Sequence, residues 1–185
     1  LAHLLQQDSA YGRWGKEVLS DDQNIIIEGK KYPVLAEKIP ANLPWRNLSV
    51  DVVIESTGRF TDEEGMRQHL LAGAKKVVLS APAKPASPDG GQGGGGNVGT
   101  FLIGVNQDKY QGEELINNAS CTTNCVAPVA AIMHSKFGIA KALMTTAHAV
   151  TAEQNLVDGP PPGGKSNDLR RARAAYTNII PTTTG

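Results

Sequence analysis

The chain reads VDVVIESTGRFTDEEGMRQHLLAGAKKVVLS from residue 50 to residue 80, and this stretch decides the fold class. Residues 50–54 are a short apolar run of the kind found in buried parallel strands. Residues 61–64 (TDEE) predict a capping box, and the amphipathic helix after it ends near Gly73. A second apolar strand follows over residues 76–80. This strand–helix–strand order is a βαβ unit and predicts an α/β fold.

The pattern continues on both sides of this unit. Residues 17–37 predict two or three short strands, with turn signals at Asp21-Asp22 and Gly29-Lys30. Further along, a strand is predicted to begin at residues 101–103, a helix over 122–137, and a strand over 142–150. We therefore expect two domains, residues 1–120 and residues 121–185.

The run ASCTTNC, residues 119–125, places Cys121 at the predicted start of the long helix. Only a thiolate attacks, and the ordinary thiol pKa is about 8.5, so a nucleophilic cysteine needs activation. Unpaired N–H groups and the helix dipole favour the anion at this position. His148 follows on the next apolar segment, MTTAH, and an imidazole can pair with the thiolate or take its proton.

Composition excludes several other classes. The 185 residues carry 18 basic and 18 acidic side chains, and zero net charge argues against a nucleic-acid-binding surface. No apolar run reaches the roughly 20 residues of a membrane span, and no signal peptide is recognisable. The two cysteines have helical same-face spacing rather than that of a disulfide framework, so we expect a cytoplasmic protein.

Several motifs occur along the chain in an order shared with one enzyme family. They are DS and YGR at residues 8–13, PANLPW at 40–45, ESTGRF at 55–60, LINN leading into the cysteine run at 115–125, DLRRARAA at 168–175 and NIIPTTTG at 178–185. In these motifs the chain resembles phosphorylating glyceraldehyde-3-phosphate dehydrogenase. The resemblance runs from near residue 1 to residue 185, apart from two insertions.

This resemblance implies a partial Rossmann-type, doubly wound NAD-binding domain followed by the start of an α+β catalytic domain. The first βαβ unit and the C-terminal half of the catalytic domain are expected to be missing. Residues 1–185 are therefore expected to be an internal fragment, inactive alone, of a homotetrameric glycolytic enzyme.

The resemblance also implies a reaction. The Cys121 thiolate attacks the aldehyde of glyceraldehyde 3-phosphate, and His148 acts as the base while hydride passes to NAD⁺. Inorganic phosphate then attacks the resulting thioester and releases 1,3-bisphosphoglycerate. The family's ligands fall on Ser120, Thr122, Thr184 and Gly185 for the attacking phosphate, on Thr151 for the substrate phosphate, on Arg171 between them, and on Ser56, Thr57, Gly58 and Ser80 for NAD.

Each of these residues also has an ordinary structural interpretation. Small residues at strand ends form turns, and an isolated cysteine is often a buried thiol. That interpretation suits Cys125, which is expected to face the packing side of the helix. At least one of Arg170, Arg171 and Arg173 is expected to serve packing only. The cysteines and histidines lack metal-finger spacing, so no metal site is expected.

Two glycine-rich patterns resemble phosphate-binding loops. Residues 91–96 fit G-x-G-x-x-G, but they lead into a predicted strand instead of a helix, which favours a flexible insertion. Residues 159–166 (GPPPGGKS) fit G-x-x-x-x-G-K-[ST]. Three consecutive prolines remove N–H donors from that loop, and residues 153–158 are a poor core strand.

The chain departs from the family pattern at three places. Val150 replaces an aromatic residue, Glu153 replaces aspartate, and the segment between Asp158 and Asp168 is longer. Three alternatives therefore stay open: erythrose-4-phosphate dehydrogenase, a P-loop NTPase, and an inactive relative kept as a scaffold. The sequence does not settle NAD against NADP preference, because the acidic residue that contacts the adenosine ribose belongs to the expected missing N-terminus.

Overall fold

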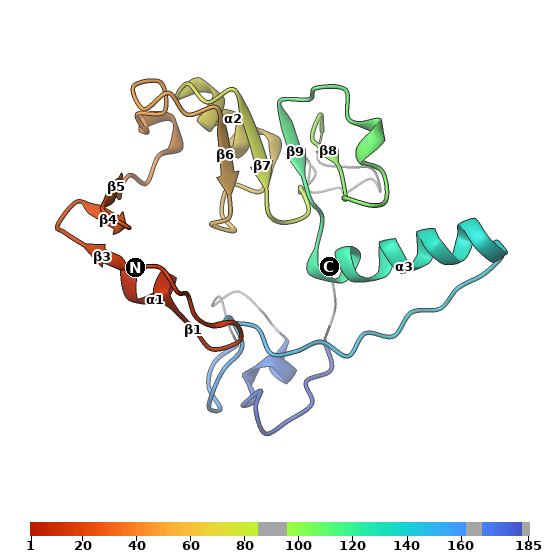
Figure 1. Cartoon of the computed structure of the whole chain (residues 1–185). Helices are drawn as coiled ribbons and strands as arrows, with labels where there is room; N and C mark the ends of the chain where they lie inside the picture. Colours follow the sequence, from red (N-terminus) through yellow and green to blue (C-terminus); the bar gives the residue numbers. More distant parts are fainter. Residues whose placement is uncertain (85–95, 162–167, 183–185) are drawn as a thin grey trace. The chain divides into compact units, whose positions relative to one another are not determined.

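The computed structural model describes residues 1–84, 96–161 and 168–182 (Figure 1). The chain divides into two compact units. One unit comprises Leu1–Val53 and Arg67–Lys76, and the other comprises Ile54–Met66 and Val77–Gly185.

The first unit contains short elements joined by tight turns. Helix α1 spans Ala2–Gln6, and strands β1 (Gln7–Asp8) and β2 (Gly12–Arg13) form a small antiparallel hairpin. Strands β3 (Val18–Ser20), β4 (Asn24–Ile27) and β5 (Lys30–Pro33) form an antiparallel sheet in that order. The short strands predicted over residues 17–37 are therefore confirmed.

Side chains and backbone conformation define the turns of this sheet. Asp21 Oδ1 accepts the backbone N–H groups of Gln23 and Asn24, which closes the turn between β3 and β4. Glu28 and Gly29 both have positive φ, 49° and 81°, as a two-residue hairpin turn matching the strand twist requires.

The parallel sheet contains four strands in the order β6-β7-β9-β8 (Figure 1). They are β6 (Val52–Glu55), β7 (Lys76–Leu79), β8 (Gly99–Thr100) and β9 (Leu115–Asn117). Strand β9 pairs in parallel with β7 on one side and with β8 on the other. The predicted α/β class is confirmed.

Helix α2 (Glu63–Leu71) connects β6 to β7. Asp62 is its N-cap, because Asp62 Oδ1 accepts the N–H of Gly65 at 2.7 Å. The capping-box pattern predicts this role for Thr61, which is instead buried. Met66 on α2 and the strand residues Val77 and Leu79 are fully buried, and these three side chains form the centre of the core.

Strand β6 departs from the fully buried strand that its apolar sequence predicts. Val53 and Glu55 are buried, whereas Val52 and Ile54 are 50% and 69% exposed. The strand lies at one edge of the sheet, and only one of its faces is covered in the described part of the chain.

Helix α3 spans Cys121–Phe137, close to the predicted 122–137. Gly138 ends it with φ of 71° and ψ of 144°, a conformation that glycine adopts without steric cost. Thr122 is its one buried residue, and its apolar side chains Val129, Ile132 and Phe137 are exposed.

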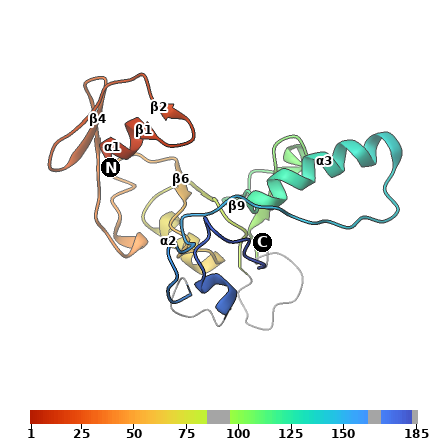
Figure 2. The same ribbon diagram turned by 90° about the horizontal axis from the view of Figure 1, so that it is seen from below.

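The remaining described chain is irregular apart from three short 3₁₀ helices, Pro40–Asn42, Gln107–Lys109 and Leu169–Ala172. The predicted strand at residues 101–103 is wrong, because the carbonyl of Leu102 accepts the N–H groups of Val105 and Asn106 in a turn. Residues 142–150 are also not a strand. They are exposed, and they run back toward the start of α3 without a ladder partner among the described residues (Figures 1 and 2).

Candidate functional site: a cysteine–histidine pair at the start of helix α3

A tight turn between β9 and α3 presents the thiol. Ala119 is buried and has φ of 60°, a left-handed conformation that costs an alanine about 1–2 kcal/mol. Asn117 is 2% exposed, and its Oδ1 accepts the N–H of Ala119 at 3.0 Å. Its Nδ2 donates to the carbonyl of Gly99 and to Thr100 Oγ1. One buried carboxamide therefore joins β8 and β9 to this turn.

Ser120 is the N-cap of α3. Its Oγ accepts the N–H of Thr123 at 3.0 Å, which is the expected geometry for a serine cap. Asn124 Nδ2 donates back to the carbonyls of Asn118 and Ser120, at 2.5 and 2.9 Å. Cys121 is consequently the first residue of the helix, where the positive end of the helix dipole favours a thiolate.

His148 reaches this thiol from the irregular segment after α3. Its Nε2 lies 3.1 Å from Cys121 Sγ, and its Nδ1 lies 2.7 Å from the carbonyl of Ala149. A carbonyl can only accept, so Nδ1 carries a proton, and Nε2 of the neutral ring faces the thiol as an acceptor. The pair is therefore arranged for proton transfer from sulfur to nitrogen.

The electrostatics of the pair favour that transfer. The hydrogen bond with His148 lowers the pKa of the Cys121 thiol; desolvation opposes this shift, and the N–H of Thr122 adds a further lowering. The pKa of His148 is raised, first by its bond to Ala149 and then by Cys121. Both shifts favour a thiolate beside an imidazolium.

A cavity of about 460 Å³ lies over the pair. Besides Cys121 and His148, its lining includes Cys125, Val126 and Val129 from α3 and residues 144–147 from the returning segment. A small molecule can therefore approach the sulfur from the solvent side. Cys125 is exposed and borders this cavity, so the predicted packing position is wrong for this residue.

The four residues expected to contact NAD lie after the carboxyl ends of two neighbouring strands. Ser56, Thr57 and Gly58 follow β6, and Ser80 follows β7. All four are exposed, and the N–H of Ser80 bonds to the carbonyl of Glu55 at 3.0 Å. Hydroxyl groups at the carboxyl edge of a parallel sheet fit a dinucleotide.

Glu55 fixes the loop after β6. Its carboxylate is buried and accepts both the N–H and the hydroxyl of Thr57, and Thr57 Oγ1 accepts the N–H of Arg59. Gly58 has φ of 71°, with no atom within 4 Å of the position that a Cβ would take. The loop is therefore held in one conformation with open space beside its glycine, which suits a cofactor.

The residues expected to bind phosphate are only partly brought together. Ser120 and Thr122 flank Cys121, but the Ser120 hydroxyl caps the helix and Thr122 is 6% exposed. Thr151 is exposed, and Arg171 is half-buried in an ion pair with Glu153; neither borders the cavity at Cys121. Thr184 and Gly185 lie outside the described residues.

The two glycine-rich patterns are also only partly described. Gly96 is the one described residue of the first pattern, and Gly159, Pro160 and Pro161 are described in the second. Gly159 donates its N–H to the carbonyl of Ala172, and residues 153–158 contain no strand. The Gly159 N–H is therefore already hydrogen-bonded and does not point toward a phosphate.

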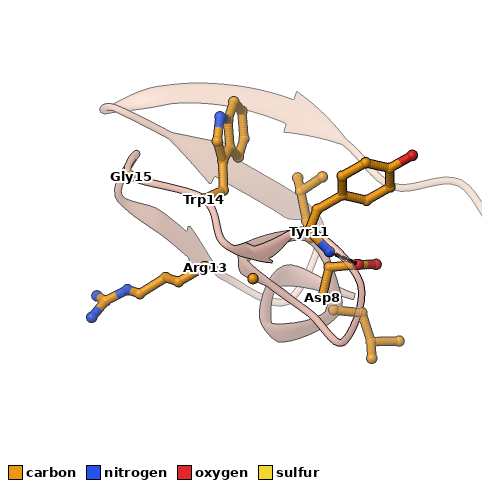
Figure 3. A pocket seen from close by; sticks show the side chains of 8 residues that line it. Asp8, Tyr11, Arg13, Trp14 and Gly15 are labelled. Carbon is orange, nitrogen blue, oxygen red and sulfur yellow. Dashed lines mark hydrogen bonds between the residues drawn. The ribbon is translucent and has the colours of Figure 1, made fainter.

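A second cavity, of about 410 Å³, lies at the β1–β2 hairpin (Figure 3). Its polar side chains do not converge: the Arg13 guanidinium points away from Tyr11, and Asp8 accepts the N–H of Tyr11. This hairpin cavity has no chemistry comparable with that at Cys121.

The described part of the chain holds neither a metal-binding cluster nor a membrane-spanning helix. Within residues 1–84, 96–161 and 168–182, no group of three histidine, cysteine or acidic side chains is placed to hold a metal ion. Over the same ranges, every helix is too short or too polar to cross a bilayer.

Sequence reasoning missed the residues that hold the site in shape. Glu55, Asn117 and Asn124 stand out in the sequence only as parts of family motifs. For Glu55 and Asn117 a signal was present, because a polar residue inside an apolar strand is buried only when its hydrogen bonds are satisfied.

A parallel α/β sheet that leads directly into a helix beginning with a cysteine, with a histidine 3.1 Å from its sulfur, defines a class of α/β proteins with a thiol site. Two family models match the chain within this class. "Glyceraldehyde 3-phosphate dehydrogenase, NAD binding domain" matches residues 1–63, and "Glyceraldehyde 3-phosphate dehydrogenase, C-terminal domain" matches residues 120–185.

Curated relatives agree with these family matches over the whole chain. It is 49% identical to glyceraldehyde-3-phosphate dehydrogenase of Geobacillus stearothermophilus over 187 residues, and 50% identical to that of Streptomyces coelicolor over 186. It is 48% identical to glyceraldehyde-3-phosphate dehydrogenase 1 of Kluyveromyces lactis over 184 residues. Each alignment covers 100% of this chain and 51% of the relative, so the chain spans about half their length. The chain belongs to the glyceraldehyde-3-phosphate dehydrogenase family.

Proposed function

We propose that the protein oxidises glyceraldehyde 3-phosphate to 1,3-bisphosphoglycerate, using NAD⁺ and inorganic phosphate. The observation that carries the proposal is the 3.1 Å approach of Cys121 Sγ to His148 Nε2 at the first residue of α3. All three of these relatives carry the name glyceraldehyde-3-phosphate dehydrogenase, which favours the triose phosphate over erythrose 4-phosphate.

In this reaction the Cys121 thiolate attacks the aldehyde carbon and forms a thiohemiacetal. The Cys121 backbone N–H and the protonated His148 stabilise the developing oxyanion. His148 gives its proton to this oxygen, which completes the thiohemiacetal and leaves the imidazole neutral. The neutral His148 then takes the hydroxyl proton back as hydride leaves the same carbon, and a thioester remains on Cys121. Bound NAD⁺ supplies the hydride acceptor. Phosphate attacks the thioester and regenerates the thiolate.

Ser56, Thr57, Gly58 and Ser80 are proposed to hold the cofactor beside this sulfur. Their exposure at the carboxyl edge of the sheet supports the assignment, as does the Glu55 carboxylate that orients Thr57. The match of residues 1–63 to an NAD-binding domain favours NAD as the cofactor.

The phosphate ligands are proposed in two groups. Ser120, Thr122, Thr184 and Gly185 bind the attacking phosphate, and Thr151 binds the substrate phosphate. Arg171 is proposed to serve between the two groups, because its planar guanidinium suits bidentate contact with phosphate oxygens.

We further propose that residues 1–120 belong to the cofactor domain and residues 121–185 to the catalytic domain of a cytoplasmic homotetramer. Membership of the family supports both proposals.

The activity is tested on the protein expressed with any sequence that flanks residues 1–185 in its natural form. NADH absorbance should rise with glyceraldehyde 3-phosphate only when phosphate is present, because the thioester needs an acceptor. His148→Asn should slow turnover by roughly 10²–10⁴-fold, the usual contribution of a positioned acid/base. Phosphate-independent turnover to the free acid would contradict the proposal.

A further inference from the structure

Two of the three clustered arginines are held by carboxylates that use both oxygens. Asp168 bonds the Nε and Nη2 of Arg170 at 2.7 and 2.8 Å, and its Oδ1 also caps the following 3₁₀ helix. Asp158 Oδ2 pairs with Arg173 at 2.7 Å, while its Oδ1 accepts the N–H of Ala174. These two carboxylates are fixed parts of the local fold.

Arg171 has a different kind of partner. Its Nη2 lies 2.5 Å from Glu153 Oε1, and this is the single contact of the Glu153 carboxylate within the described ranges. The Arg171 side chain is 24% exposed and that of Glu153 is 64% exposed. The Arg171 side chain is therefore mostly covered, whereas the Glu153 carboxylate is bonded through one oxygen and open to water. A carboxylate this exposed exchanges an ion pair for water at little cost.

Glu153 lies in a closed turn that also contains Thr151. The N–H of Gln154 bonds to the Thr151 carbonyl at 3.0 Å, and Gln154 Oε1 accepts the Thr151 N–H at 2.9 Å. Glu153 therefore links Thr151, through the backbone of this turn, to Arg171, through the ion pair. These are two of the residues proposed to bind phosphate.

We propose that Glu153 is a displaceable counter-ion of Arg171, which orients the guanidinium when no anion is bound and yields its place to a phosphate oxygen. The inference rests on the proposed function, in which Arg171 binds phosphate. Carboxylate and phosphate oxygens compete for the same fork of N–H donors, and two negative charges side by side repel. Glu153 thereby weakens phosphate binding and favours release of the phosphorylated product.

Glu153→Gln is the decisive variant, because it keeps the size of the side chain and an oxygen acceptor while removing the charge. It should lower both the KM for phosphate in NADH formation and the Kd for inorganic phosphate in calorimetry by about fivefold. The change in kcat should be smaller than the change in KM. Glu153→Asp keeps the charge, and its phosphate Kd should stay within about twofold of the parent protein.

Asp158→Asn is the matched control, since it removes a charge from the same pair of segments but not from Arg171. Its phosphate Kd should not change. An unchanged or raised Kd in Glu153→Gln, or an equal fall in Asp158→Asn, overturns the inference. Turnover that needs no phosphate overturns the proposed function instead, while calorimetry still decides the role of Glu153.

Discussion

Asn117 Oδ1 accepts the backbone N–H of Ala119 at 3.0 Å, and this bond fixes a left-handed turn two residues before the thiol. The same side chain donates to Gly99 and Thr100 on the neighbouring strand. The position of Cys121 therefore depends on a buried amide as well as on the helix that it begins.

Asn117→Ala should lower the free energy of unfolding by about 1–3 kcal/mol, because it leaves three polar groups without this partner. It should also slow alkylation of Cys121. Urea denaturation measures the first effect. Asn118→Ala, an exposed neighbour, is the control and should change stability by less than about 0.5 kcal/mol. Equal losses in the two variants would argue against the role of Asn117.

Gly138→Ala should destabilise the protein by about 1–3 kcal/mol, because φ of 71° with ψ of 144° is accessible almost only to glycine. Gly15→Ala is the control. Neither glycine has an atom within 4 Å of the position that a Cβ would take, but Gly15 has no positive φ, so its replacement should be neutral or slightly stabilising. Because neither added methyl group meets a neighbour, the melting temperatures of the two variants compare backbone strain alone. Equal melting temperatures would show that alanine is not strained at position 138.

The cysteine–histidine pair predicts a specific pH dependence. A lowered thiol pKa and a raised imidazole pKa mean that the thiolate forms at lower pH than the ordinary value of about 8.5. The rate of Cys121 alkylation by iodoacetamide should therefore rise with a midpoint below that value. His148→Gln should move this midpoint to higher pH. For each pH unit of that shift, the thiolate fraction falls about tenfold at pH values well below the midpoint.

His134→Gln is the control for this profile, because His134 lies on the same helix and bonds to the N–H of Ile139 rather than to a thiol. Its profile should match that of the parent protein. A midpoint unaffected by His148→Gln would show that the observed contact does not activate the sulfur.

The P-loop pattern at residues 159–166 predicts ATP binding, whereas membership of the dehydrogenase family predicts none. Three prolines remove phosphate donors, and the N–H of Gly159 bonds to Ala172. Thermal melts should shift upward with NAD⁺ and stay unchanged with Mg-ATP. An upward shift with Mg-ATP but not with NAD⁺ would favour a P-loop NTPase over a dehydrogenase.

The regular elements could be predicted where local patterns and tertiary contacts agree. The βαβ unit and helix α3 have clear apolar runs, a cap and a terminal glycine. The failures occur where long-range contacts decide. Residues 142–150 have strand-like composition, yet a strand needs a ladder partner, and the described chain supplies none.

The same distinction holds for the site. Residue chemistry and motif order identify Cys121 and His148, but they do not give the 3.1 Å contact between them. The apolar strand around Asn117 indicates that its side chain is bonded, but not its partners, which lie on the neighbouring strand β8. The bonds of Asn124 depend on the conformation of the turn before α3. The pairing of Arg171 with Glu153 likewise joins residues 18 positions apart.

Cys121 is proposed to carry the acyl intermediate, and trapping that intermediate shows which sulfur bears it. The protein, with any sequence that flanks residues 1–185 in its natural form, is incubated with glyceraldehyde 3-phosphate and NAD⁺ without phosphate and is then mapped by peptide mass spectrometry. The acyl group should be found on Cys121, and added phosphate should remove it. An acyl group on Cys125, or none on either cysteine while NADH forms, would show that Cys121 is not the nucleophile.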